Sequence, residues 1–105
     1  MMDMVIGVCQ VVLYMDEAFS LKEKRKTVKS LIERLRSRFN ASVAEVELND
    51  KWKNAVIGIS CISNETAHVD SMMASMVNFI ENDTRVVLSD YSTENIHVDY
   101  FKDNL

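Results

Sequence analysis

Residues 4–15 read MVIGVCQVVLYM, and this stretch decides the fold. Nearly every position is apolar, without the alternation of polar and apolar residues that marks a strand with one wet face. A continuous run of this kind is typical of a central strand that is covered on both sides. We therefore expect a sheet whose middle is formed by the start of the chain.

A helix is expected directly after this strand, from Ser20 to Phe39. Ser20 and Glu23 fit the S-x-x-E capping box, in which the two side chains satisfy backbone N–H groups at a helix start. Apolar residues then recur at helical spacing and form one stripe on a helical wheel: Leu21, Val28, Leu31, Ile32, Leu35 and Phe39. The stripe predicts that the helix packs on the sheet.

Two strands are expected next. Residues 42–48, SVAEVEL, alternate polar and apolar side chains, which predicts a half-exposed edge strand with Glu45 and Glu47 in solvent. Turn-forming residues follow. Residues 53–62, KNAVIGISCI, form another apolar run, so the two segments are interpreted as a hairpin.

A second helix is expected from Glu65 or Thr66 to Glu81. Its apolar positions again have three-and-four spacing: Val69, Met72, Met73, Met76, Val77 and Ile80. Because the methionines belong to this stripe, core packing is preferred over a Met-rich binding groove. Residues 85–92 predict a last strand, and residues 96–101 either continue it after an irregularity near residues 93–95 or form a fifth short strand.

The order β-α-β-β-α-β predicts an α+β, ferredoxin-like fold with two helices on one face of a mainly antiparallel sheet. Right-handed crossovers make the first and third strands central, and these are the two most apolar strands. The 105 residues are expected to form a single ferredoxin-like domain, residues 1–105.

Helices on one side would leave the other face of the sheet bare. The first strand is nevertheless apolar on both faces, and a monomer with so much exposed apolar surface would aggregate. We therefore expect a homodimer. The alternative is that the C-terminal segment covers this face.

The cysteines and the hydropathy indicate the compartment. Cys9 and Cys61 lie in apolar runs without a CxxC motif, so they are interpreted as small buried residues in a reducing cytoplasm. A disulfide or metal pair is the alternative. No apolar run reaches the roughly 18 residues that a membrane span needs.

No catalytic motif is visible. The sequence contains no P-loop, no GxGxxG and no HExxH, and its acids are not paired in a defined geometry. His68 and His97 are interpreted as surface residues. We therefore predict no enzyme activity, no catalytic residue, no metal and no cofactor.

The strongest functional signal is the charge of the first helix. Residues 20–39 carry eight of the twelve Lys and Arg residues and a net charge of +6, while the remainder carries −10. One flank of the helical wheel gathers the expected phosphate-binding residues: Lys22, Arg25, Lys26, Lys29 and Arg36. Lys24, Arg34 and Arg38 are expected on the other flank.

A row of cations on a rigid helix is typical of binding to the phosphate backbone of RNA, because the released counterions drive association. Trp52 is added as a candidate stacking platform for a base. It could equally cover the end of the core. The alternative for the helix itself is a solvated face or a surface for a protein partner.

Several blocks in order along the chain carry a family resemblance. They are SLKEKR at 20–25, RFNASVAEV at 38–46, Trp52 with Ala55 and Val56, and the AHV of residues 67–69. Together they resemble the YlxP-like family of small bacterial proteins of unknown function.

The resemblance implies a ferredoxin-like fold. It also implies a gene that lies near the genes of translation factors and of a ribosome-binding maturation factor. It therefore implies an accessory factor near ribosomal RNA or a ribosome-associated particle, and it brings no catalytic residue. The alternative function is a homodimeric module that binds a protein or a small ligand and has no nucleic-acid role.

Overall fold

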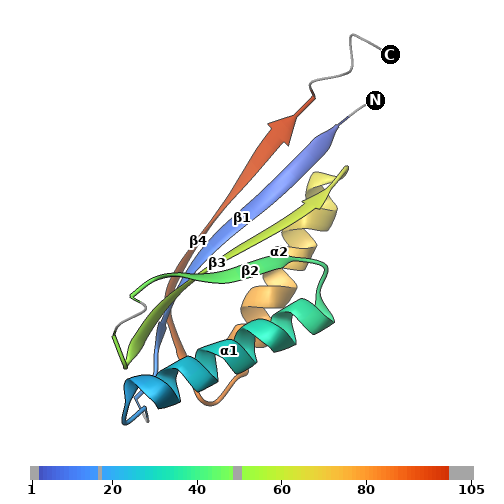
Figure 1. The fold of residues 1–105 in the computed structure, drawn as a ribbon. Helices are drawn as coiled ribbons and strands as arrows, with labels where there is room; N and C mark the ends of the chain where they lie inside the picture. Colours follow the sequence, from blue (N-terminus) through green and yellow to red (C-terminus); the bar gives the residue numbers. More distant parts are fainter. Residues whose placement is uncertain (1–2, 17, 49–50, 100–105) are drawn as a thin grey trace.

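The predicted order of strands and helices is the observed one. The computed structural model of the chain describes residues 3–16, 18–48 and 51–99, and Figure 1 shows two helices packed on a long, twisted sheet. The elements are β1 (Met4–Tyr14), α1 (Leu21–Arg38), β2 (Ser42–Glu47), β3 (Asn54–Ser63), α2 (Thr66–Glu81) and β4 (Val87–Val98).

The sheet has the strand order β2-β3-β1-β4, and every neighbouring pair is antiparallel. The most apolar strands, β1 and β3, are therefore central, and β2 is an edge strand, as predicted. β4 is one continuous strand that pairs with β1 along its whole length. The expectation of an irregularity near residues 93–95 is wrong, because those residues pair in register with β1. The pairing shifts instead at Ser89, between the partners Val12 and Leu13. Of the segment 96–101, residues 96–98 continue β4, and residues 100–101 lie outside the described residues.

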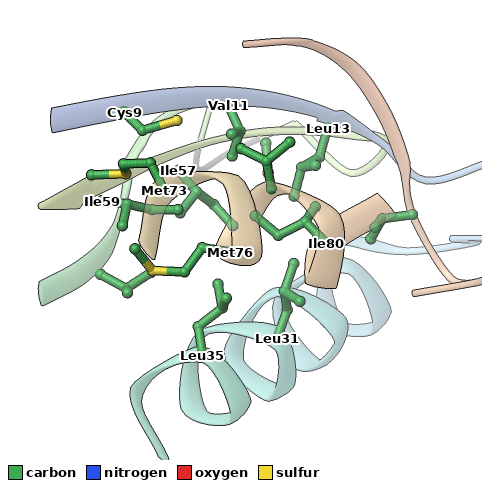
Figure 2. Packing of buried hydrophobic residues seen from close by; sticks show 14 of the residues in the cluster. Cys9, Val11, Leu13, Leu31, Leu35, Ile57, Ile59, Met73, Met76 and Ile80 are labelled. Atoms are coloured by element: carbon green, nitrogen blue, oxygen red, sulfur yellow. The ribbon is translucent and has the colours of Figure 1, made fainter. Parts of the chain in front are cut away.

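The core lies between the sheet and the two helices (Figure 2). Val11, Leu13 and Ile57 point from the central strands and are fully buried. Leu31 and Leu35 meet them from α1, and the second helix contributes Val69, Met73, Met76, Val77 and Ile80. Met73 and Met76 are buried and Met72 is partly buried, so the core interpretation of the methionines is confirmed.

Two local features position the helices. Ser20 caps α1, because its hydroxyl oxygen accepts a hydrogen bond from the backbone N–H of Glu23 at 3.1 Å. Gly7 lets β1 pass close to α2, because a Cβ at this position would lie only 2.4 Å from Cγ1 of Val69. The hydrogen bond from the Glu23 N–H to Ser20 is the first half of the predicted capping box. The close packing of α2 explains why β1 has a glycine at position 7.

The second face of the sheet has no helix on it (Figure 1). Strand alternation directs five exposed large apolar side chains to this bare face: Met4, Val46, Ile62, Val87 and Ile96. Ile6 pairs with Ile62 on one side and with Ile96 on the other, which makes an isoleucine row across three strands. The alternative expectation is that the C-terminal segment covers this face. Residues 100–105 of that segment lie outside the described residues.

Candidate nucleic-acid interface

Four cations form a stripe on the outer face of α1. Lys22, Arg25, Lys26 and Lys29 follow the spacing i, i+3, i+4 and i+7, so they share one side of the helix over about 10 Å. All four are exposed. Within residues 3–16, 18–48 and 51–99, the side chains of these four cations make no hydrogen bond and no ion pair. We call these four residues the basic stripe.

Lys24, by contrast, is a structural residue. It was expected on an exposed flank, but its side chain is fully buried, where its ammonium contacts the carboxylate of Glu45 and donates to the carbonyl of Leu48 at 2.9 Å. Glu45 was expected in solvent, and its side chain is only 15% exposed. Both expectations are wrong for one reason: Val43 faces the core, so strand alternation turns Glu45 under α1 as well.

The remaining cations of α1 are held by the fold. Arg34 and Arg38 lie over the ring of Phe79, with guanidinium-to-centroid distances of 5.0 and 5.4 Å. Arg36, a predicted phosphate contact, is exposed, but its guanidinium donates to the carbonyl of Val43. Arg36 therefore anchors the end of α1 to β2 and is separate from the basic stripe.

Asp83 is the buried acid of this region. Its carboxylate accepts hydrogen bonds from Arg85 at 2.7 and 3.0 Å and from Arg34 at 3.2 Å. The hydrogen bonds from Arg85 and the charges of Arg85 and Arg34 hold the pKa of Asp83 below its ordinary value of 3.8, against the opposing effect of burial. This cluster fastens the α2–β4 connection to α1.

Asp83→Asn is expected to lower the free energy of unfolding by about 1.5–3 kcal/mol at neutral pH, because charge-assisted hydrogen bonds are lost. Since the folded pKa lies below the unfolded value, the unfolded state binds more protons in acid. The contribution is complete above about pH 5 and is lost as the pH falls below about 4. Urea unfolding from pH 3 to 7 measures it. A difference between wild type and variant that is constant over this range would contradict the assignment.

Two exposed aromatic residues lie at the end of the molecule where α1 begins. Trp52 is 51% exposed, which does not fit the interpretation as a cover on the core. Phe19 is 76% exposed and was not singled out in the sequence. A signal was available: an apolar residue before a helix cap normally packs on the fourth helical residue, and here that residue is Lys24. No hydrophobic staple can form, so Phe19 is left in solvent.

The cysteines and histidines lie apart from the basic stripe in the fold. Burial raises the pKa of the Cys9 and Cys61 thiols, which disfavours the nucleophilic thiolate. Both cysteines are free and buried, as expected. His68 and His97 are exposed. In the part of the chain that the structure describes, no three His, Cys, Asp or Glu side chains gather where they could hold a metal ion.

Neither α1 nor α2, the helices of the described ranges, combines the length and the apolar character that a membrane crossing demands.

One groove runs between α2 and β4, with a volume of about 440 Å³. Met73 and Val77 form part of its floor, and Tyr91 and Thr93 stand on the strand side. At one end the amide of Asn95 donates to the carboxylate of Asp70 at 2.8 Å. The groove therefore has an apolar floor with a polar rim and lies away from the basic stripe.

The strand order, the antiparallel pairing and the two helices on one face define a ferredoxin-like domain. Residues 6–93 match the family described as "Protein of unknown function (DUF503)", and the chain belongs to this family. The chain is 30% identical to the "Uncharacterized protein YlxP" of Bacillus subtilis (strain 168) over 74 residues, 70% of this chain and 78% of that protein. The family resemblance seen in the sequence is thereby confirmed.

Two solved structures are similar in fold. A structural-genomics protein, YJCS, aligns with a TM-score of 0.54 and 13% identity over 87% of this chain and 98% of its own. A dimeric ferredoxin-like protein of unknown function from Thermobifida fusca aligns with a TM-score of 0.46 and 9% identity, over 89% and 92% of the two chains. At these identities the likeness concerns the fold alone.

Proposed function

We propose that this protein is a non-enzymatic accessory factor that binds RNA through the outer face of α1. The observation that carries the proposal is that the cations of this helix fall into two groups, those with a partner in the described fold and those without. Lys24, Arg34, Arg36 and Arg38 have partners inside the domain, whereas the four cations of the basic stripe are exposed and have no described partner. Contacts within the described fold therefore do not explain why these four positions carry cations.

A phosphate backbone fits this stripe better than an acidic protein surface does. The four charges lie in a row on a helix that its cap and its buried leucines hold rigid. A polyanion with evenly spaced charges can meet all four at once, and each contact releases condensed counterions. The rest of the chain carries −10, so an RNA approaching from any other side is repelled.

Binding to RNA is tested by titration at several salt concentrations. Four phosphate contacts predict a slope of about −3 in a plot of log K against log salt for a single strand. Raising salt from 50 to 200 mM should therefore weaken binding about 50-fold. Tight binding that ignores salt, or the absence of RNA binding at 50 mM salt, would refute the proposal.

Ribosomal RNA, or a ribosome-associated particle, is the target that we propose. This choice follows the gene neighbourhood that the family resemblance implies. Co-sedimentation with ribosomal subunits at low salt, and release at high salt, is the expected result. A pull-down of a ribosomal protein that survives nuclease treatment would instead favour that protein as the partner.

A second proposed property is self-association through the bare face of the sheet. The outward positions of the central strands β1 and β3 carry no charged side chain. Among the described residues of the sheet, the acids on this face lie on the edge strands: Glu47 on β2, and Asp90 and Glu94 on β4. The uncharged centre of this face, with the isoleucine row, can pack on its own copy while the acids stay at its edges. Such a homodimer leaves both basic stripes on the outside.

The homodimer predicts a molar mass of two chains by light scattering. Ile62→Glu and Ile96→Glu should each shift the protein to a monomer, because a charge would be buried in the contact. Both side chains are exposed in the single chain, at 55% and 43%, so the fold should be retained. Phe19→Glu, the matched control off this face, should stay dimeric. A wild-type protein that is monomeric at high concentration would exclude the dimer.

A further inference from the structure

Two exposed aromatic side chains mark the end of the molecule where the basic stripe begins. Two chain connections meet there, the β1–α1 connection with Phe19 and the β2–β3 connection with Trp52. The backbone N–H of Met15 donates to the carbonyl of Lys53 at 2.8 Å, and the ammonium of Lys53 donates to the carbonyl of Asp16 at 3.4 Å. The two connections are therefore hydrogen-bonded to each other.

The buried Lys24 links the same parts from the helix side. It belongs to the second turn of α1 and donates to the carbonyl of Leu48, at the start of the β2–β3 connection. Phe19 and Trp52 are thus both carried by segments that are fixed to the beginning of α1. Neither side chain belongs to the described core, and the exposed fraction is 76% for Phe19 and 51% for Trp52.

Cations lie near both aromatic residues in the sequence. Trp52 stands between Lys51 and Lys53, and Phe19 precedes Lys22, the first residue of the basic stripe, by three positions. The acids at this end are engaged within the fold: Asp16 accepts from the hydroxyl of Tyr14 at 3.0 Å, and Glu23 belongs to the helix cap. Other acids of the two connections lie outside the described residues.

We infer that the bound RNA is unpaired where it meets this end, and that Phe19 and Trp52 are stacking platforms for its bases. The inference rests on the proposed RNA binding and names its substrate class. Exposed aromatic rings between cations are the arrangement by which proteins hold single strands, because every unpaired base has a face that can stack. A duplex keeps its bases stacked on one another, so it can use the cations but not the rings.

The test compares a single-stranded RNA with a perfect duplex of the same length, by fluorescence anisotropy of a labelled strand. Phe19→Ala and Trp52→Ala should each weaken single-strand binding about 5- to 150-fold and should change duplex binding less than about twofold. Phe19→Tyr and Trp52→Phe keep a ring and should retain most of the affinity. Trp52 is the sole tryptophan, so its fluorescence should be quenched by the single strand and not by the duplex.

Tyr91→Ala is the matched control, because Tyr91 is also 51% exposed but lies on β4 by the α2 groove. It should bind both RNAs as the wild type does. If Phe19→Ala and Trp52→Ala leave salt-sensitive single-strand binding intact, the stacking inference is wrong and the RNA proposal stands. If the wild type binds neither RNA, the RNA proposal itself has failed, and the stacking inference fails with it.

Discussion

Charge reversal of Lys26 and Lys29 is expected to weaken RNA binding by at least about 100-fold at 0.15 M salt. The two residues form the C-terminal half of the basic stripe, so the variant removes two phosphate contacts and adds two repulsive charges beside Lys22 and Arg25. Both side chains are exposed and have no described partner, so the fold should be unchanged. Circular dichroism and urea unfolding check this point.

The neutral pair Lys26→Gln with Lys29→Gln separates lost contacts from added repulsion. Loss of two contacts should weaken binding about tenfold at 0.15 M salt and should halve the salt slope. Ser71→Glu with Ser75→Glu is the matched control, because it changes the net charge by the same amount on the exposed side of α2. This control should bind within about threefold of the wild type.

The position of the charge, rather than the total charge, decides between these outcomes. Equal weakening by the two charge-matched pairs would indicate a diffuse field of the whole molecule and would remove α1 as the binding surface. Weakening by the lysine pair alone supports the basic stripe. The additional loss of affinity in the charge-reversal variant, compared with the neutral pair, then indicates how closely the phosphates approach the basic stripe.

The fold could be predicted from the sequence because local patterns and topology agree. The apolar run of β1 predicts a central strand, and the strand order places it at the centre. The sequence does not decide how β4 ends, because the polar residues 93–95 interrupt the apolar pattern there. Pairing with the long strand β1 keeps this segment extended, which is a tertiary effect that no local pattern carries.

The basic stripe could be predicted in outline, but the roles of single cations could not. A helical wheel shows which side chains share a flank, and it does not show what lies beneath that flank. Lys24 appeared to be one more exposed lysine, because only the packing of α1 over β2 reveals its carboxylate partner. Phe19 was missed although the sequence holds a signal for its exposure, because Lys24 occupies the position where a hydrophobic staple needs an apolar residue.

Lys24→Met is expected to lower the free energy of unfolding by about 2–4 kcal/mol. The substitution keeps most of the side-chain volume but leaves the carboxylate of Glu45 under α1 without its ammonium partner. It also removes a donor from the carbonyl of Leu48, a residue with a left-handed backbone conformation at φ 60°. The loss is large beside the 5–15 kcal/mol that typically stabilises a domain.

The double variant Lys24→Met with Glu45→Leu distinguishes a buried charge from a poor fit of methionine. When both charges are replaced by apolar groups, no ion is left unpaired, and most of the lost stability should return. Urea midpoints for the wild type, the two single variants and the double variant form the complete cycle. If Lys24→Met alone is as stable as the wild type, Lys24 does not fasten α1 to the β2–β3 hairpin. If Glu45→Leu fails to rescue Lys24→Met, the cost lies in packing rather than in the unpaired carboxylate.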